Sequence, residues 1–113
     1  MSRIQTYSEF WFFYLQEHAH ATNRQLHFIG TTLVFIFAAT AMATANYALF
    51  WLCPIAGYAF AWVGHFKIEH NRPATFKHPF WSLISDFRMY FYFLTGKLNQ
   101  EIEKSKTYKF VST

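Results

Sequence analysis

The sequence predicts an all-α fold: a small integral membrane helical protein, with a two-crossing hairpin flanked by interfacial amphipathic helices. Residues 25–66 contain no Asp, Glu, Lys or Arg, and about 40 uncharged residues are too many for one membrane crossing but enough for two. Aromatic residues make up 23% of the chain and charged residues only 14%, against roughly 25% charged residues in soluble domains. Six histidines gather around the two ends of the uncharged stretch.

The chain of 113 residues is expected to form one domain, residues 1–113. Its net charge of +4 suits contact with anionic lipid headgroups. The basic residues are scattered, so no nucleic-acid partner is expected. Cys53 is the single cysteine, which excludes an internal disulfide and a thiolate metal cluster, and we expect a buried, inert thiol. The N-terminus has no small-residue cleavage site, so no cleavable signal peptide is expected.

A first helix is predicted from Ser8 and Glu9 to about His18. Ser8 can cap it, and Glu9 suits the positive end of the helix dipole. Residues 10–15 are apolar or aromatic, yet the helix is too short to span a bilayer. We therefore expect it to lie in the membrane interface or to pack on the hairpin.

The two crossings follow. The second helix is predicted to begin at Thr22 or Asn23 and to cross over about residues 28–45. Residues 44–47 are the best turn, and the third helix is expected to cross over about residues 47–64.

The third helix carries Gly57, Ala61 and Gly64 at positions i, i+4 and i+7. Such a stripe of small residues lets two crossings pack closely. The helix should end near His70, because Pro73 disfavours helical backbone at the residue before it.

Two further segments complete the chain. Residues 74–78 are expected to be a connector, and Pro79 should open a fourth helix that reaches about Gly96. This aromatic-rich helix is predicted to be interfacial or packed, rather than a third crossing. Residues 97–113 form a polar tail, predicted to be helical through Glu103.

The distribution of charge predicts the topology. Arg24, Lys67, Arg72 and Lys77 flank the hairpin at its histidine-bearing end, and the turn around Asn46 has no charge. By the positive-inside rule, the histidine end and both termini are expected to face the cytoplasm.

Histidines define the candidate site. A hairpin returns to the side that it left, so His27 and His65 are expected at one face of the membrane. His65 and Glu69 share a helix face and can give two ligands, or one ligand and an acid that orients it. The alternative is an ordinary polar helix end. His18 and His27 would point to opposite faces of one straight helix, so a break at Thr22–Asn23 is needed for them to converge.

Other polar residues lie nearby. His20 is expected to face solvent. Arg72 can bind a carboxylate by a two-point pair or bind lipid headgroups. His78 is a candidate helix cap or ligand, and Asp86 is expected to pair with Arg88 or with a histidine.

Imidazoles without thiolates suit iron, zinc, copper or nickel, and composition does not choose among these metals. Two other functions fit the same residues. One is a haem electron carrier with His27 and His65 as axial ligands. The other is a non-enzymatic membrane adaptor or scaffold, in which the histidines are interface residues.

Four motifs carry a resemblance to a known family. They are Tyr14…His18, Asn23-Arg-x2-His27-x2-Gly30, Gly64-His65-x3-Glu69 and Arg72-Pro73-Ala74. Over roughly residues 8–90 the chain resembles the Mpo-type membrane family, whose characterised eukaryotic members are iron(II)-dependent 2-hydroxy fatty acid dioxygenases of α-oxidation. This chain is shorter than those enzymes, and its residues 75–81 resemble the pattern of short bacterial members.

The resemblance implies iron-site roles for His18, His27 and His65. Glu69 would be a ligand or a supporting acid. His78 is a candidate fourth imidazole, which rests on its position more than on the family motif.

The implied activity is a dioxygenase reaction that cleaves a 2-hydroxy fatty acid between C1 and C2 and leaves an acid one carbon shorter. It requires Fe(II), O2 and a lipid or fatty-acid substrate at the membrane, with Arg72 steadying the substrate carboxylate. A homodimer would bury the polar face of so small a hairpin.

Overall fold

The structure is a computed structural model that describes residues 6–73 and 77–108, and these residues form helices and turns without a strand. The predicted all-α class is confirmed, and residues 74–76 of the predicted connector lie outside the described ranges. The chain divides into two compact units. Residues 20–73 are called the hairpin unit, and residues 1–19 with 74–113 the aromatic unit. Each is described by itself, and the assignment of one domain stays a prediction.

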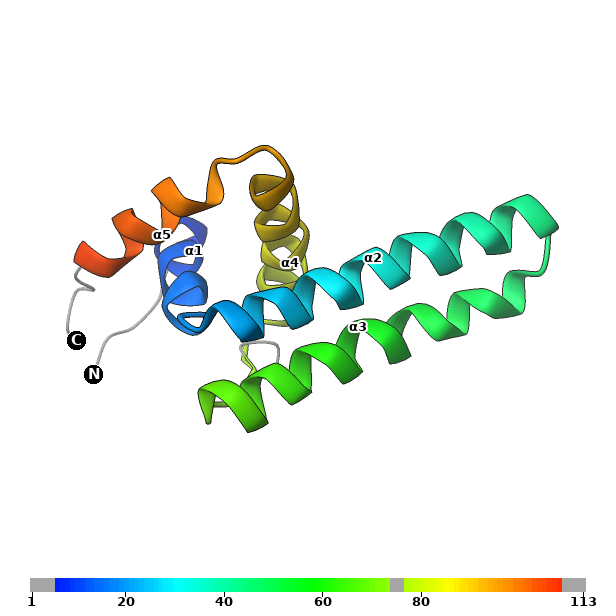
Figure 1. Ribbon diagram of the computed structural model, residues 1–113, viewed down its shortest axis with the longest axis horizontal. Helices are drawn as coiled ribbons and strands as arrows, with labels where there is room; N and C mark the ends of the chain where they lie inside the picture. Colours follow the sequence, from blue (N-terminus) through cyan, green and yellow to red (C-terminus); the bar gives the residue numbers. More distant parts are fainter. Residues whose placement is uncertain (1–5, 74–76, 109–113) are drawn as a thin grey trace. The chain divides into compact units, whose positions relative to one another are not determined.

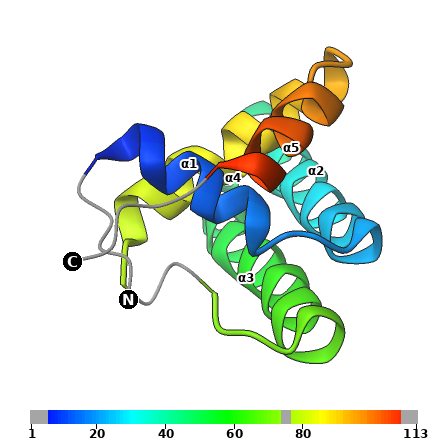
Figure 2. The same ribbon diagram turned by 90° about the vertical axis from the view of Figure 1, so that its left-hand side faces the viewer.

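The hairpin unit consists of two long helical arms that lie side by side, as Figures 1 and 2 show. The first arm is α2 (Ala21–Thr44). The second is α3 (Leu52–Val63), preceded by a 3₁₀ turn, η1 (Tyr47–Trp51), and followed by a π-helix, η2 (Gly64–Glu69). Both arms are long and apolar enough to cross a membrane, which agrees with the predicted hairpin.

Small residues set the distance between the two arms. A Cβ atom on Gly30 would lie 3.1 Å from the Cβ of Phe60 and 3.3 Å from the carbonyl oxygen of Ala56. Gly57, from the predicted stripe, is less crowded, since its Cβ would lie 3.5 Å from Val34. The contact between the arms is therefore closer at Gly30 on α2 than at Gly57.

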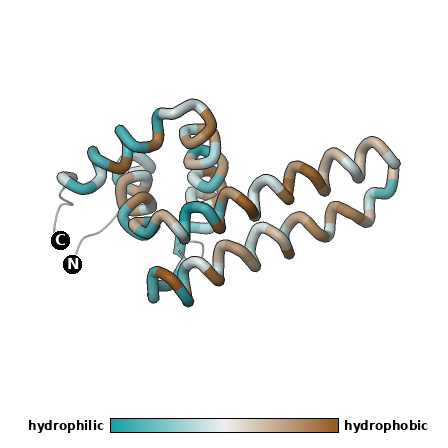
Figure 3. The backbone as a smooth tube through the Cα atoms, in the orientation of Figure 1, coloured by the Kyte–Doolittle hydropathy of each residue, from teal (hydrophilic) through white to brown (hydrophobic). Residues whose placement is uncertain are grey.

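Most large apolar side chains of the hairpin unit point outward. Figure 3 shows the hydrophobic colour running along both arms. Exposed examples are Ile29, Phe35, Ile36, Met42, Trp51, Ile55 and Trp62. Cys53, predicted to be buried, is only half-buried, and its thiol donates to the Val34 carbonyl oxygen at 3.5 Å.

The aromatic unit packs α1 (Tyr7–Gln16), α4 (Pro79–Leu94) and α5 (Leu98–Thr107) on one another. Its buried core is made of large side chains: Phe10, Trp11, Tyr14, Leu15 and Met89. Pro79 opens α4 as predicted.

The ends of two helices differ from the predictions. Thr6, not Ser8, caps α1, because the Thr6 hydroxyl accepts from the Glu9 backbone N–H at 3.3 Å. Thr6 and Glu9 have the spacing of a capping box, which places Ser8 inside the first turn. The last helix reaches Thr107 instead of Glu103.

Candidate metal centre

The hairpin brings His27 and His65 into direct contact. His27 lies in the second turn of α2 and His65 in η2, and their ring centroids are 5.1 Å apart with the planes nearly perpendicular. Both side chains are buried. This contact agrees with the expectation that a hairpin returns both histidines to the same end, and their place at one face of a membrane stays a prediction.

The partners of both rings fix the protonation of the imidazoles. His27 Nδ1 lies 2.9 Å from the Asn23 carbonyl oxygen, and His65 Nδ1 lies 2.7 Å from Asn71 Oδ1. These oxygens only accept, so each Nδ1 carries the proton and donates. The lone pair of each ring is therefore on Nε2. Metal-binding histidines use this arrangement, in which the second nitrogen orients the ring.

Asn23 connects the two histidine-bearing segments. It is completely buried, and a Cβ on Gly64 would lie 1.8 Å from its Oδ1. The Gly64 position therefore has to be glycine for Asn23 to occupy this place. The Asn23 carbonyl oxygen accepts from the His27 ring, and the Asn23 side chain lies over Gly64, the residue before His65. Asn23 therefore sets the separation of the two rings.

Glu69 fastens the start of α2 to the end of η2. Its Oε2 accepts from the His20 backbone N–H at 2.8 Å and from Asn23 Nδ2 at 3.1 Å. His20 is the N-cap residue of α2 and has no side-chain capping bond. The Glu69 carboxylate thus receives an N–H at the positive end of a helix, where a negative charge is stabilised.

The π-helix explains how Asn71 reaches His65. π-helical turns are rare and are often found at functional sites. The chain leaves η2 through His70, which has a φ of 59°, and the Asn71 N–H then bonds the His65 carbonyl oxygen at 3.0 Å. The left-handed residue turns the backbone so that the Asn71 side chain meets the His65 ring.

His18 lies in the aromatic unit, just after α1. The His18 Nδ1 donates to the Tyr14 carbonyl oxygen at 2.6 Å, and the Tyr14 ring stacks on the imidazole with centroids 4.1 Å apart. Its lone pair is therefore also on Nε2. The helix break that was predicted at Thr22–Asn23 lies earlier, at residues 17–20. Convergence of His18 and His27 stays a prediction.

Three buried histidines, His18, His27 and His65, could hold a metal ion. All three are held through Nδ1 by an oxygen acceptor. This shared arrangement fits a set of neutral imidazole ligands.

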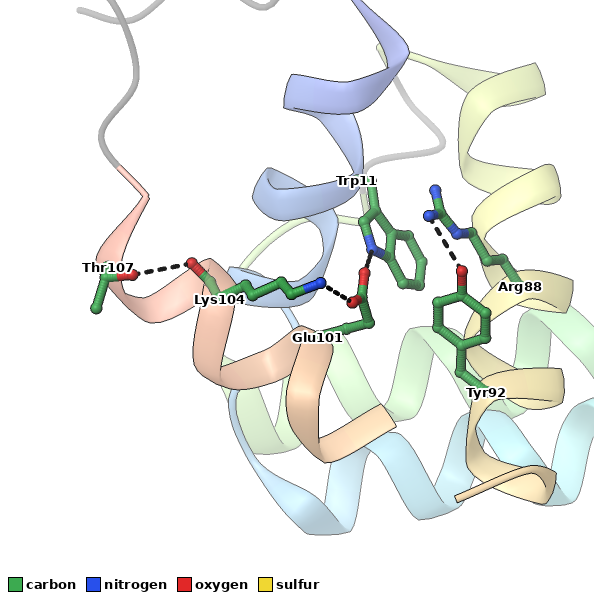
Figure 4. A network of polar contacts seen from close by, with 6 residues as sticks. All are labelled: Trp11, Arg88, Tyr92, Glu101, Lys104 and Thr107. Carbon is green, nitrogen blue, oxygen red and sulfur yellow. Dashed lines mark hydrogen bonds and ion pairs between the residues drawn. The ribbon is translucent and has the colours of Figure 1, made fainter. Parts of the chain in front are cut away.

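Asp86 and Arg88 do not pair with each other. Asp86 Oδ1 accepts a hydrogen bond from the Tyr14 hydroxyl. Arg88 lies over the Trp11 ring at 4.2 Å and donates to the Tyr92 hydroxyl at 3.3 Å (Figure 4). Of the two predicted partners of Asp86, Arg88 is therefore wrong, because the guanidinium packs on aromatic rings and the Asp86 carboxyl group accepts from a phenol.

The remaining predicted residues lie as follows. The His20 side chain is exposed, as expected. Arg72 is also exposed. His78 is the N-cap residue of α4 without a side-chain capping bond, and its ring stacks on Trp81 and meets Phe10 edge-on.

The sequence analysis missed two positioning residues, Asn23 and Asn71. Asn23 stands four residues before His27, a spacing that allows a histidine ring to bond a carbonyl one turn earlier. The same spacing separates Tyr14 from His18. No comparable local signal marks Asn71.

A family model described as 2-hydroxy-palmitic acid dioxygenase Mpo1-like matches residues 4–98 of the chain. Comparison with curated proteins and with solved structures gives no match.

Proposed function

The chain belongs to the Mpo1-like family, and from this premise we propose that it is a membrane-embedded, Fe(II)-dependent dioxygenase that shortens 2-hydroxy fatty acids by one carbon. One observation carries the proposal: His27 and His65 are buried, in contact, and both oriented through Nδ1. Buried imidazoles with this tautomer suit a catalytic metal better than they suit a structural core.

The ligands would be His18, His27 and His65, with His78 as a candidate fourth imidazole. His18 stands two residues before His20, which begins the hairpin unit, and two residues of chain reach at most about 7 Å. Glu69 would act as the supporting acid. Bound Fe(II) would supply Lewis acidity and activation of O2.

The chain's own residues would bind and orient the substrate. Arg72 is exposed just beyond the histidine end of the hairpin, where its guanidinium can take a carboxylate by two hydrogen bonds. The exposed apolar side chains of the hairpin offer contacts to the acyl chain. With C1 released as CO2, cleavage removes four electrons from the substrate, and one O2 accepts them in forming water and the new carboxylate.

Polar side chains within the first arm of the hairpin are also hydrogen-bonded in the way that a membrane-spanning helix requires. The hydroxyls of Thr32, Thr40 and Thr44 each bond the carbonyl oxygen four residues earlier, at 2.7–2.8 Å. Such bonds satisfy hydroxyls inside the helix, as a lipid environment requires. We propose that the hairpin spans the membrane with its histidine end and both termini in the cytoplasm, and that a homodimer is its assembly.

The distance between the two rings argues against the haem alternative. Metal–imidazole bonds of about 2.0–2.1 Å would place axial imidazole centroids roughly 6 Å apart on opposite faces of a porphyrin. His27 and His65 have centroids 5.1 Å apart and touch directly. The adaptor alternative predicts that no metal binds in a fixed ratio.

The test uses the full chain, purified in detergent and loaded anaerobically with Fe(II), then given 2-hydroxypalmitate and O2. We expect mass spectrometry to show a fatty acid one carbon shorter. His65→Ala should abolish the product, whereas His20→Ala, which removes an exposed imidazole, should retain it. Full turnover by His65→Ala in metal-free buffer would contradict the proposal.

A further inference from the structure

Tyr14 joins a carboxylate of α4 to the imidazole of His18. Tyr14 is completely buried, and its hydroxyl donates a hydrogen bond to Asp86 Oδ1. The same residue holds His18 twice, through its carbonyl oxygen at 2.6 Å and through its stacked ring at 4.1 Å. The Tyr14 ring also stacks on Trp11, with centroids 5.9 Å apart and planes at 11°. The Tyr14 ring is therefore held by two stacked neighbours and at its hydroxyl.

His18 needs such support because the helix has ended before it. The last residue of α1 is Gln16, and Glu17 is its C-cap. A residue beyond the C-cap lacks the regular backbone bonding that fixes side-chain direction within a helix. The orientation of the His18 ring is therefore set by its contacts with Tyr14.

We propose that Asp86 and Tyr14 are positioning residues that hold the His18 imidazole in the orientation for metal binding. Asp86 acts through Tyr14: it fixes the phenol, and the phenol fixes the imidazole ring. The expected effect on metal affinity rests on the proposed function, because it takes His18 to be a metal ligand. Partners that orient metal-binding histidines typically contribute a factor of about 10–100 to metal affinity.

The same two helices provide a matched control. Tyr7 stands seven residues before Tyr14 on α1, and its hydroxyl bonds Ser85 Oγ at 3.0 Å, one residue before Asp86 on α4. Both tyrosines therefore tie α1 to α4 through their hydroxyls. In the described contacts Tyr14 alone of the two stacks on His18.

The first experiment measures the affinity of the full-length protein for Co(II), a spectroscopic substitute for Fe(II). Asp86→Leu should weaken binding by about 10-fold or more and alter the Co(II) absorption bands. Asp86→Asn keeps an oxygen acceptor for the Tyr14 hydroxyl and should stay close to wild type. Tyr7→Phe should also leave the affinity unchanged. An equal loss in Tyr7→Phe would show that helix packing, and not ring orientation, is responsible, and would overturn the proposal.

Two further variants keep the test valid if Asp86→Leu folds poorly. The double change Tyr14→Phe with Asp86→Leu removes both hydrogen-bonding groups and leaves no buried partner unsatisfied. It should fold and still show the loss of affinity. In a His18→Ala background, Asp86→Leu should cause no additional loss, because the ring that it orients is gone. An undiminished additional loss would overturn the proposal.

The second experiment needs no metal. Nitrogen NMR of histidine-labelled, metal-free protein should show His18 as a single Nδ1-protonated tautomer in wild type and in Tyr7→Phe. Asp86→Leu should give a mixture of tautomers or a broadened signal. An unchanged His18 signal in Asp86→Leu would overturn the inference, whether or not the protein binds metal. If no variant and no wild-type sample binds metal while the NMR result holds, the proposed function fails and the positioning of His18 stands.

Discussion

The two units of this protein differ in how many large apolar side chains they bury. The hairpin unit buries mainly small and polar residues, and apart from Phe28 most of its large apolar residues are exposed. The buried ones include Asn23, His27, Gly30, Ala41, Ala56, Gly64 and His65. The aromatic unit buries Phe10, Trp11, Tyr14 and Leu15 and exposes Lys104 and Lys106 of α5. Figure 3 shows hydrophilic colour along much of this helix.

This difference indicates two different solvents. In water a core forms because large apolar side chains leave the solvent. In lipid that driving force between helices is absent, and helices associate through small residues and polar contacts. The hairpin unit follows the second pattern. The core of the aromatic unit follows the first, although α4 also exposes Phe80, Leu83, Ile84, Phe91, Phe93 and Leu94.

The largest effect is expected from tryptophan removal. Trp11→Ala in the aromatic unit empties a buried site and should lower the free energy of unfolding by about 3–5 kcal/mol. Trp51→Ala removes a side chain that is 76% exposed and should cost less than about 0.5 kcal/mol. Thermal unfolding in detergent measures both. A large loss in Trp51→Ala would mean that the hairpin packs on something other than lipid.

A charged residue placed on the exposed surface of the hairpin tests directly whether that surface faces lipid. Ile36 is exposed near the middle of α2. Ile36→Asp should raise the apparent free energy of membrane insertion by about 3–4 kcal/mol, because an unfavourable Asp replaces a favourable Ile. Asn99→Asp on the polar surface of α5 should leave insertion unchanged. The fraction of protein in the membrane pellet reports the difference, and equal recovery of both variants would remove the case for a spanning hairpin.

The next effect concerns packing at the histidine end. Gly64→Ala places a methyl group where Asn23 Oδ1 lies, and the shift of Asn23 would break its bond to Glu69. We expect a loss of about 1–3 kcal/mol in stability, together with weaker metal binding. Gly57→Ala meets only an ordinary contact with Val34 and should be nearly neutral. Metal titration of both variants shows whether the close contact of Asn23 with Gly64 positions the His27 and His65 rings.

The aromatic unit should lose stability as the pH rises. Burial raises the pKa of Asp86 to about 7, although the hydrogen bond from Tyr14 lowers it. The folded state therefore holds this proton more tightly than the unfolded chain does. The contribution of Asp86 to stability is complete below about pH 4 and is lost as the pH rises to about 7, where the folded carboxyl ionises. The melting temperature of wild type should fall over this range more than that of Asp86→Asn, and parallel curves would refute the assignment.

The smallest effects are expected on the exposed face of α5. Lys106→Met breaks an ion pair with Glu103 in which both side chains are largely exposed, and should change stability by less than about 0.5 kcal/mol. Lys104→Met should cost slightly more, because its partner Glu101 also accepts from Trp11 Nε1 at 3.0 Å (Figure 4). Urea titration of both variants gives the comparison.

Much of this architecture follows from patterns within short segments. The uncharged stretch of residues 25–66 is long enough for two crossings and so predicts a hairpin. A hairpin requires His27 and His65 to lie at the same end, whatever the details of packing. Pro79 marks a helix start because its fixed φ suits a first turn. The capping box of Thr6 and Glu9 is equally local, and its spacing in the sequence indicates Thr6 as the cap in place of Ser8.

Only the tertiary structure shows which atoms hold the site. Asn23 lies over Gly64 and binds Glu69, and the Tyr14 hydroxyl binds Asp86, across 46 and 72 positions of sequence respectively. Such contacts depend on how helices rotate and approach one another, and neither periodicity nor charge pattern specifies this. The helices and the hairpin arose from interactions within a few residues along the chain. The His18 and His27 rings bond carbonyl oxygens only four residues earlier, so this part of their orientation is local. The bonds of Asn23 to Glu69 and of Tyr14 to Asp86 are long-range, and only folding brings those partners together.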